Sequence, residues 1–189
     1  RVLVFNLNTD NTFPDRIPDY VLGQSNFYDE VGTTTQSGFG EPRGIDFDSV
    51  NNRLFVVEGV NNRVLVFDTT SITNGENAVN VIGQSDFITA TGVTSQSRLN
   101  SPDAVLYDAA GQRLFVSQSS GNRVTVYDVS SITDGENAVN VLGQTIFTGS
   151  GAGNTQSGMS APRGMAYDAA NSRLFVAQSG NNRVTVYDV

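Results

Sequence analysis

Three charged residues stand at a spacing of 60 residues, each directly after a proline: Arg43, Asp103 and Arg163. Two guanidinium groups and a carboxylate brought together could bind a carboxylate, a phosphate or an acidic side chain, because the guanidinium fork matches planar anions. The same residues could equally form surface ion pairs, which are common and contribute little to stability. The sequence leaves both interpretations open and favours the surface pairs.

A second candidate site is the pair Asp46 and Asp48. Residues two apart on a β-strand project from the same face, so both carboxylates would point to one side. Only the first copy of the repeat has this pair, because Leu106 and Ala166 stand where Asp46 does. Calcium needs about six to eight oxygen ligands, so two aspartates make a weak metal candidate. We expect no cofactor, and calcium is the only one for which the sequence offers candidate ligands.

The residue types that are missing limit the chemistry further. The chain has 189 residues and a net charge of −8, with no His and no Cys, and all 11 basic residues are arginine. The usual zinc, haem and iron–sulfur ligands are therefore absent, and a nucleophilic serine would have no ordinary basic partner. An acidic protein also lacks the cationic surface that binds nucleic acid. We therefore expect no nucleic-acid partner, no membrane insertion and no enzymatic activity.

A repeat of 60 residues organises the whole chain. Asn-Arg-Val recurs at Asn62, Asn122 and Asn182, and each copy contains short runs rich in Val, Leu, Phe and Tyr between turn residues. These runs predict β-strands, as at Gly164–Asp168, Arg173–Ala177 and Arg183–Asp188. Several runs are apolar on both faces, which requires a sheet buried on both sides. The pattern predicts an all-β fold of four-stranded antiparallel blades, a β-propeller.

The third copy resembles the NHL repeat of β-propeller proteins. The resemblance is carried by Pro162-Arg-Gly-Met-Ala-Tyr-Asp168, Arg173-Leu-Phe-Val-Ala-Gln178 and Asn181-Asn-Arg183. It covers essentially the whole chain and implies strands A to D, counted outward from the axis of a ring that usually has six blades. The family's Asn-His-Arg reads Asn-Asn-Arg here, so any histidine-dependent chemistry of the family is not carried over. The resemblance is specific for the fold and uninformative about function.

Labelled this way, the chain forms one propeller domain of about three blades. Residues 1–23 would supply strands C and D of a partial blade, 42–83 and 102–143 would be complete blades, and 162–189 would supply strands A to C. Blade faces left open would expose more apolar surface than a soluble monomer tolerates. The chain is therefore expected to be part of a longer polypeptide, half of a six-bladed homodimer, or a subunit of a larger homo-assembly formed by strand donation.

The connections from strand D to strand A, here called the D–A loops, are the expected binding face. They are Phe27–Glu41, Phe87–Ser101 and Phe147–Ala161, and their tips differ between copies. Long loops on a repeated frame often carry function. Together with Arg43, Asp103 and Arg163, the candidate partner-binding residues are Tyr28, Asp29, Glu30, Thr89, Thr91, Arg98, Thr148 and Asn154. The arginines and aspartates that recur in every copy are instead expected to form a repeated turn network.

The sequence as a whole favours a non-catalytic interaction or scaffold module that binds a protein or a glycan through the D–A loop face. One alternative is a structural subunit that assembles by strand donation between chains. Another is a calcium-dependent, lactonase-like hydrolase. Lysine-free surfaces rich in Asn, Thr and Gly suggest an extracytoplasmic or secreted prokaryotic protein.

Overall fold

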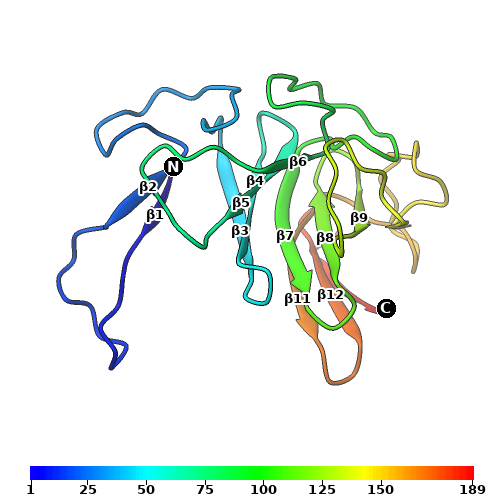
Figure 1. Cartoon of the computed structure of the whole chain (residues 1–189). Coiled ribbons are helices and arrows are strands. Elements are labelled where there is room, and N and C mark those ends of the chain that lie inside the picture. Colours follow the sequence, from blue (N-terminus) through cyan, green and yellow to red (C-terminus); the bar gives the residue numbers. More distant parts are fainter.

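The computed structural model describes residues 1–189 and contains β-strands but no helices (Figure 1). The strands lie close to the runs that the sequence predicts, although the outermost strand of each blade is shorter than expected. The first four are β1 (Val2–Val4), β2 (Tyr20–Leu22), β3 (Pro42–Asp48) and β4 (Arg53–Glu58). The next five are β5 (Arg63–Asp68), β6 (Asn80–Ile82), β7 (Pro102–Asp108), β8 (Arg113–Gln118) and β9 (Arg123–Asp128). The last four are β10 (Asn140–Leu142), β11 (Pro162–Asp168), β12 (Arg173–Gln178) and β13 (Arg183–Asp188).

The strands form antiparallel sheets in which neighbours in sequence are neighbours in space. Two sheets are complete, with the orders β3-β4-β5-β6 and β7-β8-β9-β10. The sheet β11-β12-β13 has three strands, and β1-β2 has two. The sheets stand side by side as blades around a shared inner side (Figure 1). The expectation of propeller blades, about three in this chain, is confirmed.

Asparagine and glycine shape the tight turns inside each blade. Asn62, Asn122 and Asn182 precede the third strand and have φ values of 52°, 48° and 50°. Asparagine tolerates this left-handed conformation better than most residues do. Its recurrence at one turn position explains why the strand pairing that follows has the same register in all three copies, with Glu58 opposite Arg63 and Gln118 opposite Arg123.

The core consists of three apolar clusters, each filling the space between two successive sheets. Aromatic pairs repeat at the contacts between blades: Phe55 lies 5.8 Å from Tyr107, and Phe115 lies 6.1 Å from Tyr167, between ring centroids. Inner strands also approach closely, since a Cβ on Gly44 would lie 2.9 Å from the Cα of Ala104. Glycine at this position permits that approach.

The outer rim is fastened by the loop between the third and fourth strands of each blade. The Asn74 side chain accepts a hydrogen bond from the amide of Val21 in the preceding sheet, and the Gly75 amide donates to the carbonyl of Val21. Asp134 and Gly135 contact Val81 in the same way. The near-identity of these loops in two copies is therefore explained by contacts between blades.

The first complete sheet and the last sheet leave apolar surface uncovered. Ile45 and Phe47 on β3 are 54% and 47% exposed, and Val184 and Val186 on β13 are 60% and 53% exposed. A cavity of about 430 Å³ lies where β1 meets β3, and it is lined almost entirely by hydrophobic residues. The structure has no helix with the length and hydropathy needed to cross a membrane.

Candidate functional site at the inner ends of the blades

A β-bulge exposes one charged side chain at the start of each inner strand. The pairing register of β3 shifts between Pro42 and Ile45, and β7 and β11 show the same irregularity. Arg43, Asp103 and Arg163 are the residues directly after the proline in these bulges. Bulges leave residues unpaired and redirect their side chains, and they are enriched next to active sites. The repeated backbone irregularity therefore places the three residues together.

The two arginines converge on one carboxylate oxygen. Arg43 Nη1 lies 3.2 Å and Arg163 Nη1 lies 3.5 Å from Oδ1 of Asp103. Arg43 Nη2 also lies 2.9 Å from Oε2 of Glu41. Of these four residues, here called the axial cluster, Asp103 is the least exposed, with 16% of its side chain accessible, and Arg163 is the most exposed, with 57%. The arginines therefore keep donors free for a ligand.

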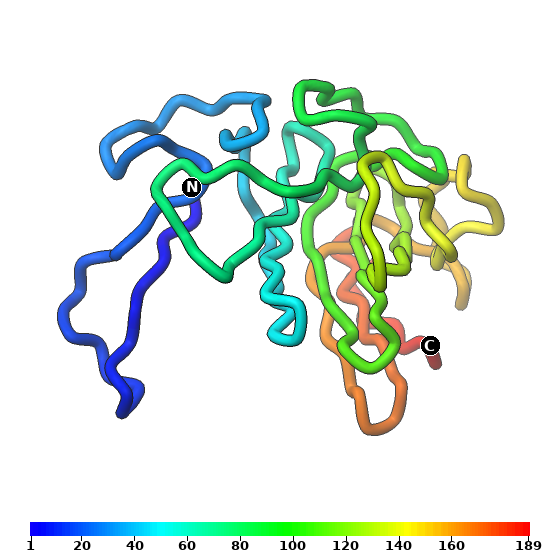
Figure 2. The backbone as a smooth tube through the Cα atoms, viewed as in Figure 1, coloured from blue at the N-terminus to red at the C-terminus, as the bar shows by residue number.

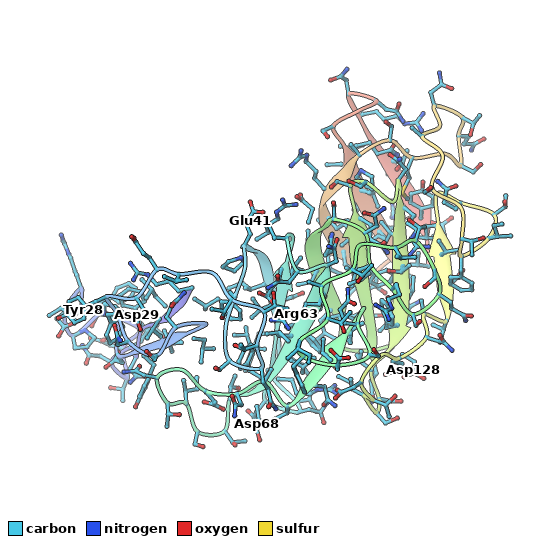
Figure 3. The ribbon with its side chains drawn as sticks, turned by 90° about the horizontal axis from the view of Figure 1, so that it is seen from above. Tyr28, Asp29, Glu41, Arg63, Asp68 and Asp128 are labelled. Atoms are coloured by element: carbon cyan, nitrogen blue, oxygen red, sulfur yellow. The ribbon has the colours of Figure 1, made fainter.

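The neighbouring residues hold the two arginines differently. Arg43 lies against Gly59, where a Cβ would be 2.3 Å from its Nε. Arg163 instead donates from Nε to the hydroxyl of Ser179, at 3.2 Å. Viewed from above, Glu41 lies on the inner side of the arc of blades, whereas Asp68 and Asp128 lie at its outer rim (Figure 3). The axial cluster is thus on the side that faces the propeller axis.

The pair Asp46 and Asp48 does not form a metal site in the structure. Asp46 accepts hydrogen bonds from the amides of Phe47 and Tyr107, at 2.8 and 2.6 Å. Asp48 is fully buried and lies 2.6 Å from Nη2 of Arg53. The structure contains no group of three or more His, Cys, Asp or Glu residues placed to hold a metal ion. Calcium binding stays untested, and the contacts of Asp46 and Asp48 give no support to a calcium site at these two residues.

The recurring charges form the turn network that the repeat predicts. Arg113 pairs with Asp108 at 2.7 Å, as Arg53 does with Asp48, and Arg173 lies 3.9 Å from Asp168. Burial raises the pKa of Asp48, but hydrogen bonds from Asn51, Arg53 and the amide of Val50 outweigh it and lower the pKa to about 2. Asp68 and Asp128 accept from the amides of Thr70 and Ser130. These residues are structural.

Buried arginines tie the D–A loops to the blades, which sequence reasoning did not identify. Arg63 is fully buried, pairs with Glu58, and donates to the carbonyls of Phe87, Thr35 and Gly38. Arg123 makes the equivalent contacts with Phe147, Ser95 and Arg98. Burial raises the pKa of Glu58, although Arg63 opposes the shift. The recurrence of this arginine in each copy was the signal in the sequence that could have identified it. Its partners could not be read from the sequence, because they lie 24 to 28 residues away.

The candidate residues of the D–A loops lie on one face but not in one site. The three loops share the same end of the blades (Figure 2). Tyr28 is 94% exposed, and Glu30, Thr91, Thr148 and Asn154 are also exposed. Thr89 instead bonds to Asp86, and Arg98 donates to Oε1 of Gln84 at 2.7 Å, so both stabilise their own loop. Asp29 lines a separate cavity in the first loop.

Comparison with solved structures finds a chain in "Crystal structure of Nidogen/Laminin Complex" with a TM-score of 0.48 and 17% sequence identity. The match covers 77% of this chain and 47% of the other, so the chain spans about half the length of that relative. No curated protein matches the sequence.

A family model described as "Lactonase, 7-bladed beta-propeller" matches residues 2–189. The expectation of a non-enzymatic protein is therefore wrong: missing His, Cys and Lys excludes side-chain nucleophiles of the usual kind, but it leaves water activated by carboxylates and arginines available. The propeller part of the NHL resemblance is confirmed, the NHL assignment itself stays a prediction, and the family ring has seven blades where the resemblance implied six. The chain belongs to the lactonase family of seven-bladed β-propellers.

Proposed function

We propose that the axial cluster binds and hydrolyses a lactone within a propeller ring to which this chain contributes its blades. The observation that carries the proposal is the convergence of Arg43 and Arg163, from two different blades, on Oδ1 of Asp103. Two guanidinium groups held next to each other form a binding site for a carbonyl oxygen that becomes negatively charged, and for the carboxylate that is released.

The reaction needs a nucleophile, a base and a group that stabilises negative charge. Water loses a proton to Glu41 as it adds to the lactone carbonyl. The ring C–O bond then breaks, the proton on Glu41 passes to the departing ring oxygen, and the new carboxylic acid ionises, so that a hydroxycarboxylate and one proton are released. The arginines stabilise the oxyanion. Glu41 is the group that accepts the proton of water, because its carboxylate lies beside Arg43 and its side chain is 50% exposed, so that water reaches it. Asp103, in contact with both arginines, is the positioning residue that holds them together.

The experiment is a hydrolysis assay with four-, five- and six-membered lactones, in which the acid that the reaction releases is titrated at constant pH. We expect Arg43→Ala and Arg163→Ala each to lower kcat/KM by at least about tenfold, the cost of a charge-assisted hydrogen bond. Arg16→Ala is the matched control, since Arg16 is an exposed arginine outside the cluster. Equal activity in all three variants, or no hydrolysis of any lactone by the wild type, would rule out the proposal.

A second candidate function is protein binding at the D–A loop face. Tyr28 and Ile88 occupy equivalent loop positions and are 94% and 76% exposed. Exposed aromatic and aliphatic residues on neighbouring loops are typical anchors of protein interfaces. The double variant Tyr28→Ser/Ile88→Ser is expected to abolish binding of a protein partner isolated with the wild type while leaving lactone hydrolysis unchanged. Retained binding would contradict this function.

A further inference from the structure

A polar cavity of about 380 Å³ opens in the first D–A loop and shares no residue with the axial cluster. One of its 10 lining residues, Val31, is hydrophobic. The side chains of Gln24, Asp29, Thr33 and Thr35 are among the polar groups of its wall. No arginine lines it, although 11 arginines are distributed along the chain. The cavity is therefore suited to a polar ligand. A comparison of the first and second copies of the repeat indicates the charge of that ligand.

The second copy of the repeat fills the corresponding place with an arginine. Gly38 and Gln24 stand 60 residues before Arg98 and Gln84. In the second copy, Arg98 Nη1 donates to Oε1 of Gln84 at 2.7 Å. In the first copy there is no side chain at residue 38, and Gln24 donates from Nε2 to the carbonyl of Val31 at 3.1 Å while its Oε1 accepts no hydrogen bond. The cavity thus retains the acceptor of a guanidinium site without the guanidinium.

The two copies carry a carboxylate at different positions of this loop: Asp29 in the first copy, and Asp86, which is equivalent to Asn26, in the second. Asp29 lines the cavity, and the equivalent residue of the second copy is Thr89. Oδ2 of Asp29 accepts from the side chains of Ser25 and Asn26, at 2.6 and 2.7 Å, which fixes the carboxylate. Its Oδ1 accepts no hydrogen bond from the protein. Relative to the second copy, the site has lost the cation of Arg98 but still has a carboxylate, now on Asp29, so it favours a cationic ligand.

The walls of the cavity are held by residues of the adjacent blade. The buried Arg63 donates to the carbonyls of Thr35 and Gly38, at 2.9 and 3.0 Å. Gly75 also lines the cavity, and its amide donates to the carbonyl of Val21 at 3.0 Å. A site held in this way needs little ordering when a ligand binds.

We propose that this cavity binds the guanidinium group of a ligand, either a small free cation or an arginine side chain of a peptide. The guanidinium takes the place that Arg98 occupies in the second copy. It donates to Oε1 of Gln24 and to Oδ1 of Asp29, and the hydroxyls of Thr33 and Thr35 line the same space. Charge-assisted hydrogen bonds from a planar, forked donor supply both the affinity and the specificity.

Isothermal titration of the whole chain with agmatine tests the proposal, with N-butylurea as the uncharged analogue. We expect agmatine to bind and N-butylurea to bind at least about tenfold more weakly, because the charge contributes to each hydrogen bond. Asp29→Asn is expected to weaken agmatine binding by a similar factor. The matched control Glu30→Gln removes a neighbouring exposed carboxylate that does not line this cavity, and it should change the affinity less than about threefold.

A second variant restores the side chain that the second copy has. A Cβ at residue 38 would lie 1.8 Å from Oγ1 of Thr33, so Gly38→Arg is combined with Thr33→Ala, which removes this atom, and Thr33→Ala alone is the control. The double variant should lose agmatine binding with an unchanged circular-dichroism spectrum. Tighter binding of an acetyl-Gly-Arg-Gly-amide peptide than of agmatine would identify an arginine side chain as the ligand, and the reverse a free cation. No agmatine binding by the wild type, or equal affinities for Asp29→Asn and wild type, would overturn the proposal.

Discussion

Arg63 and Glu58 form an ion pair in which neither side chain is exposed to solvent. Glu58 also accepts hydrogen bonds from the Gly40 amide, at 2.6 Å, and from the side chain of Asn61, at 3.1 Å. Arg63 in turn holds the carbonyls of two D–A loops. The pair is therefore a junction between a blade and the loops on either side of it, and both candidate sites depend on those loops.

Removing Arg63 should destabilise the protein strongly. Arg63→Ala leaves the buried carboxylate of Glu58 without its partner, and breaking a buried pair in this way costs about 3–5 kcal/mol. Glu58→Gln should cost less than about 2 kcal/mol, because the second blade already has Gln118 at this position and tolerates an Arg123 Nε without a partner. Urea unfolding of both variants checks the difference, and equal costs would contradict it.

The carboxylate of Asp48 should make stability depend on acid pH. Its pKa is lowered from 3.8 to about 2 in the folded protein. Because the pKa of Asp48 is lower in the folded than in the unfolded protein, its ionised carboxylate stabilises the fold by about 2 kcal/mol. This stabilisation is complete above pH 3.8 and is lost as the pH falls towards 2. Wild type should therefore lose more stability than Asp48→Asn between pH 5 and about 2.

Urea unfolding across this pH range measures the loss in each protein. Glu30→Gln serves as the control, because Glu30 is exposed and makes no hydrogen bond through its side chain. It should show the same pH dependence as the wild type. Parallel curves for wild type and Asp48→Asn would show that Asp48 is not the group responsible.

Calcium should not stabilise the protein through Asp46 and Asp48. Both oxygens of Asp46 accept backbone amides, and Asp48 is paired with Arg53. We expect the thermal midpoint to change by less than about 1 °C with excess calcium or with EDTA, because only a ligand that binds the folded state raises it. An increase of several degrees that Asp46→Asn abolishes would show that this pair binds calcium.

The first complete sheet and the last sheet should associate with a second copy of the chain. Phe47 on β3 and Phe175 on β12 occupy the positions that form the aromatic pairs between blades, yet neither has an aromatic partner. Packing of the β13 side of one copy on the β3 side of another would pair them. Light scattering of residues 1–189 should give a mass above 20.2 kDa, and Phe47→Glu should reduce it to that value.

Strand donation through β1 and β2 gives a different outcome in the same measurement. Deleting residues 1–23 would then abolish association, whereas Phe47→Glu would leave it intact. Tyr28→Ser is the control for loss of an exposed aromatic residue elsewhere. A mass of 20.2 kDa for the unmodified chain would contradict both forms of association.

Much of the fold could be predicted from the sequence, because the strands and turns depend on local residue types. Valine and aromatic runs mark the strands, and Asn182 takes the left-handed conformation that its turn predicts. The 60-residue spacing of Arg43, Asp103 and Arg163 predicted that they lie near one another, but only the structure shows that both arginine side chains contact Oδ1 of Asp103. The cavity beside Gly38 could not be predicted, because it depends on how the first D–A loop folds back over Gln24. The expectation of a non-enzyme failed because it considered metal ligands and side-chain nucleophiles but not water as the nucleophile.

The most direct test of the account is a double-mutant cycle of Arg43→Ala and Arg163→Ala on kcat/KM for lactone hydrolysis. If both guanidinium groups act on one oxyanion held beside Asp103, their effects are non-additive, and the double variant loses little more activity than the worse single variant. Asp103→Asn should then resemble the double variant, because it releases both arginines at once. Additive losses, or full activity in Asp103→Asn, would contradict a single site at the axial cluster.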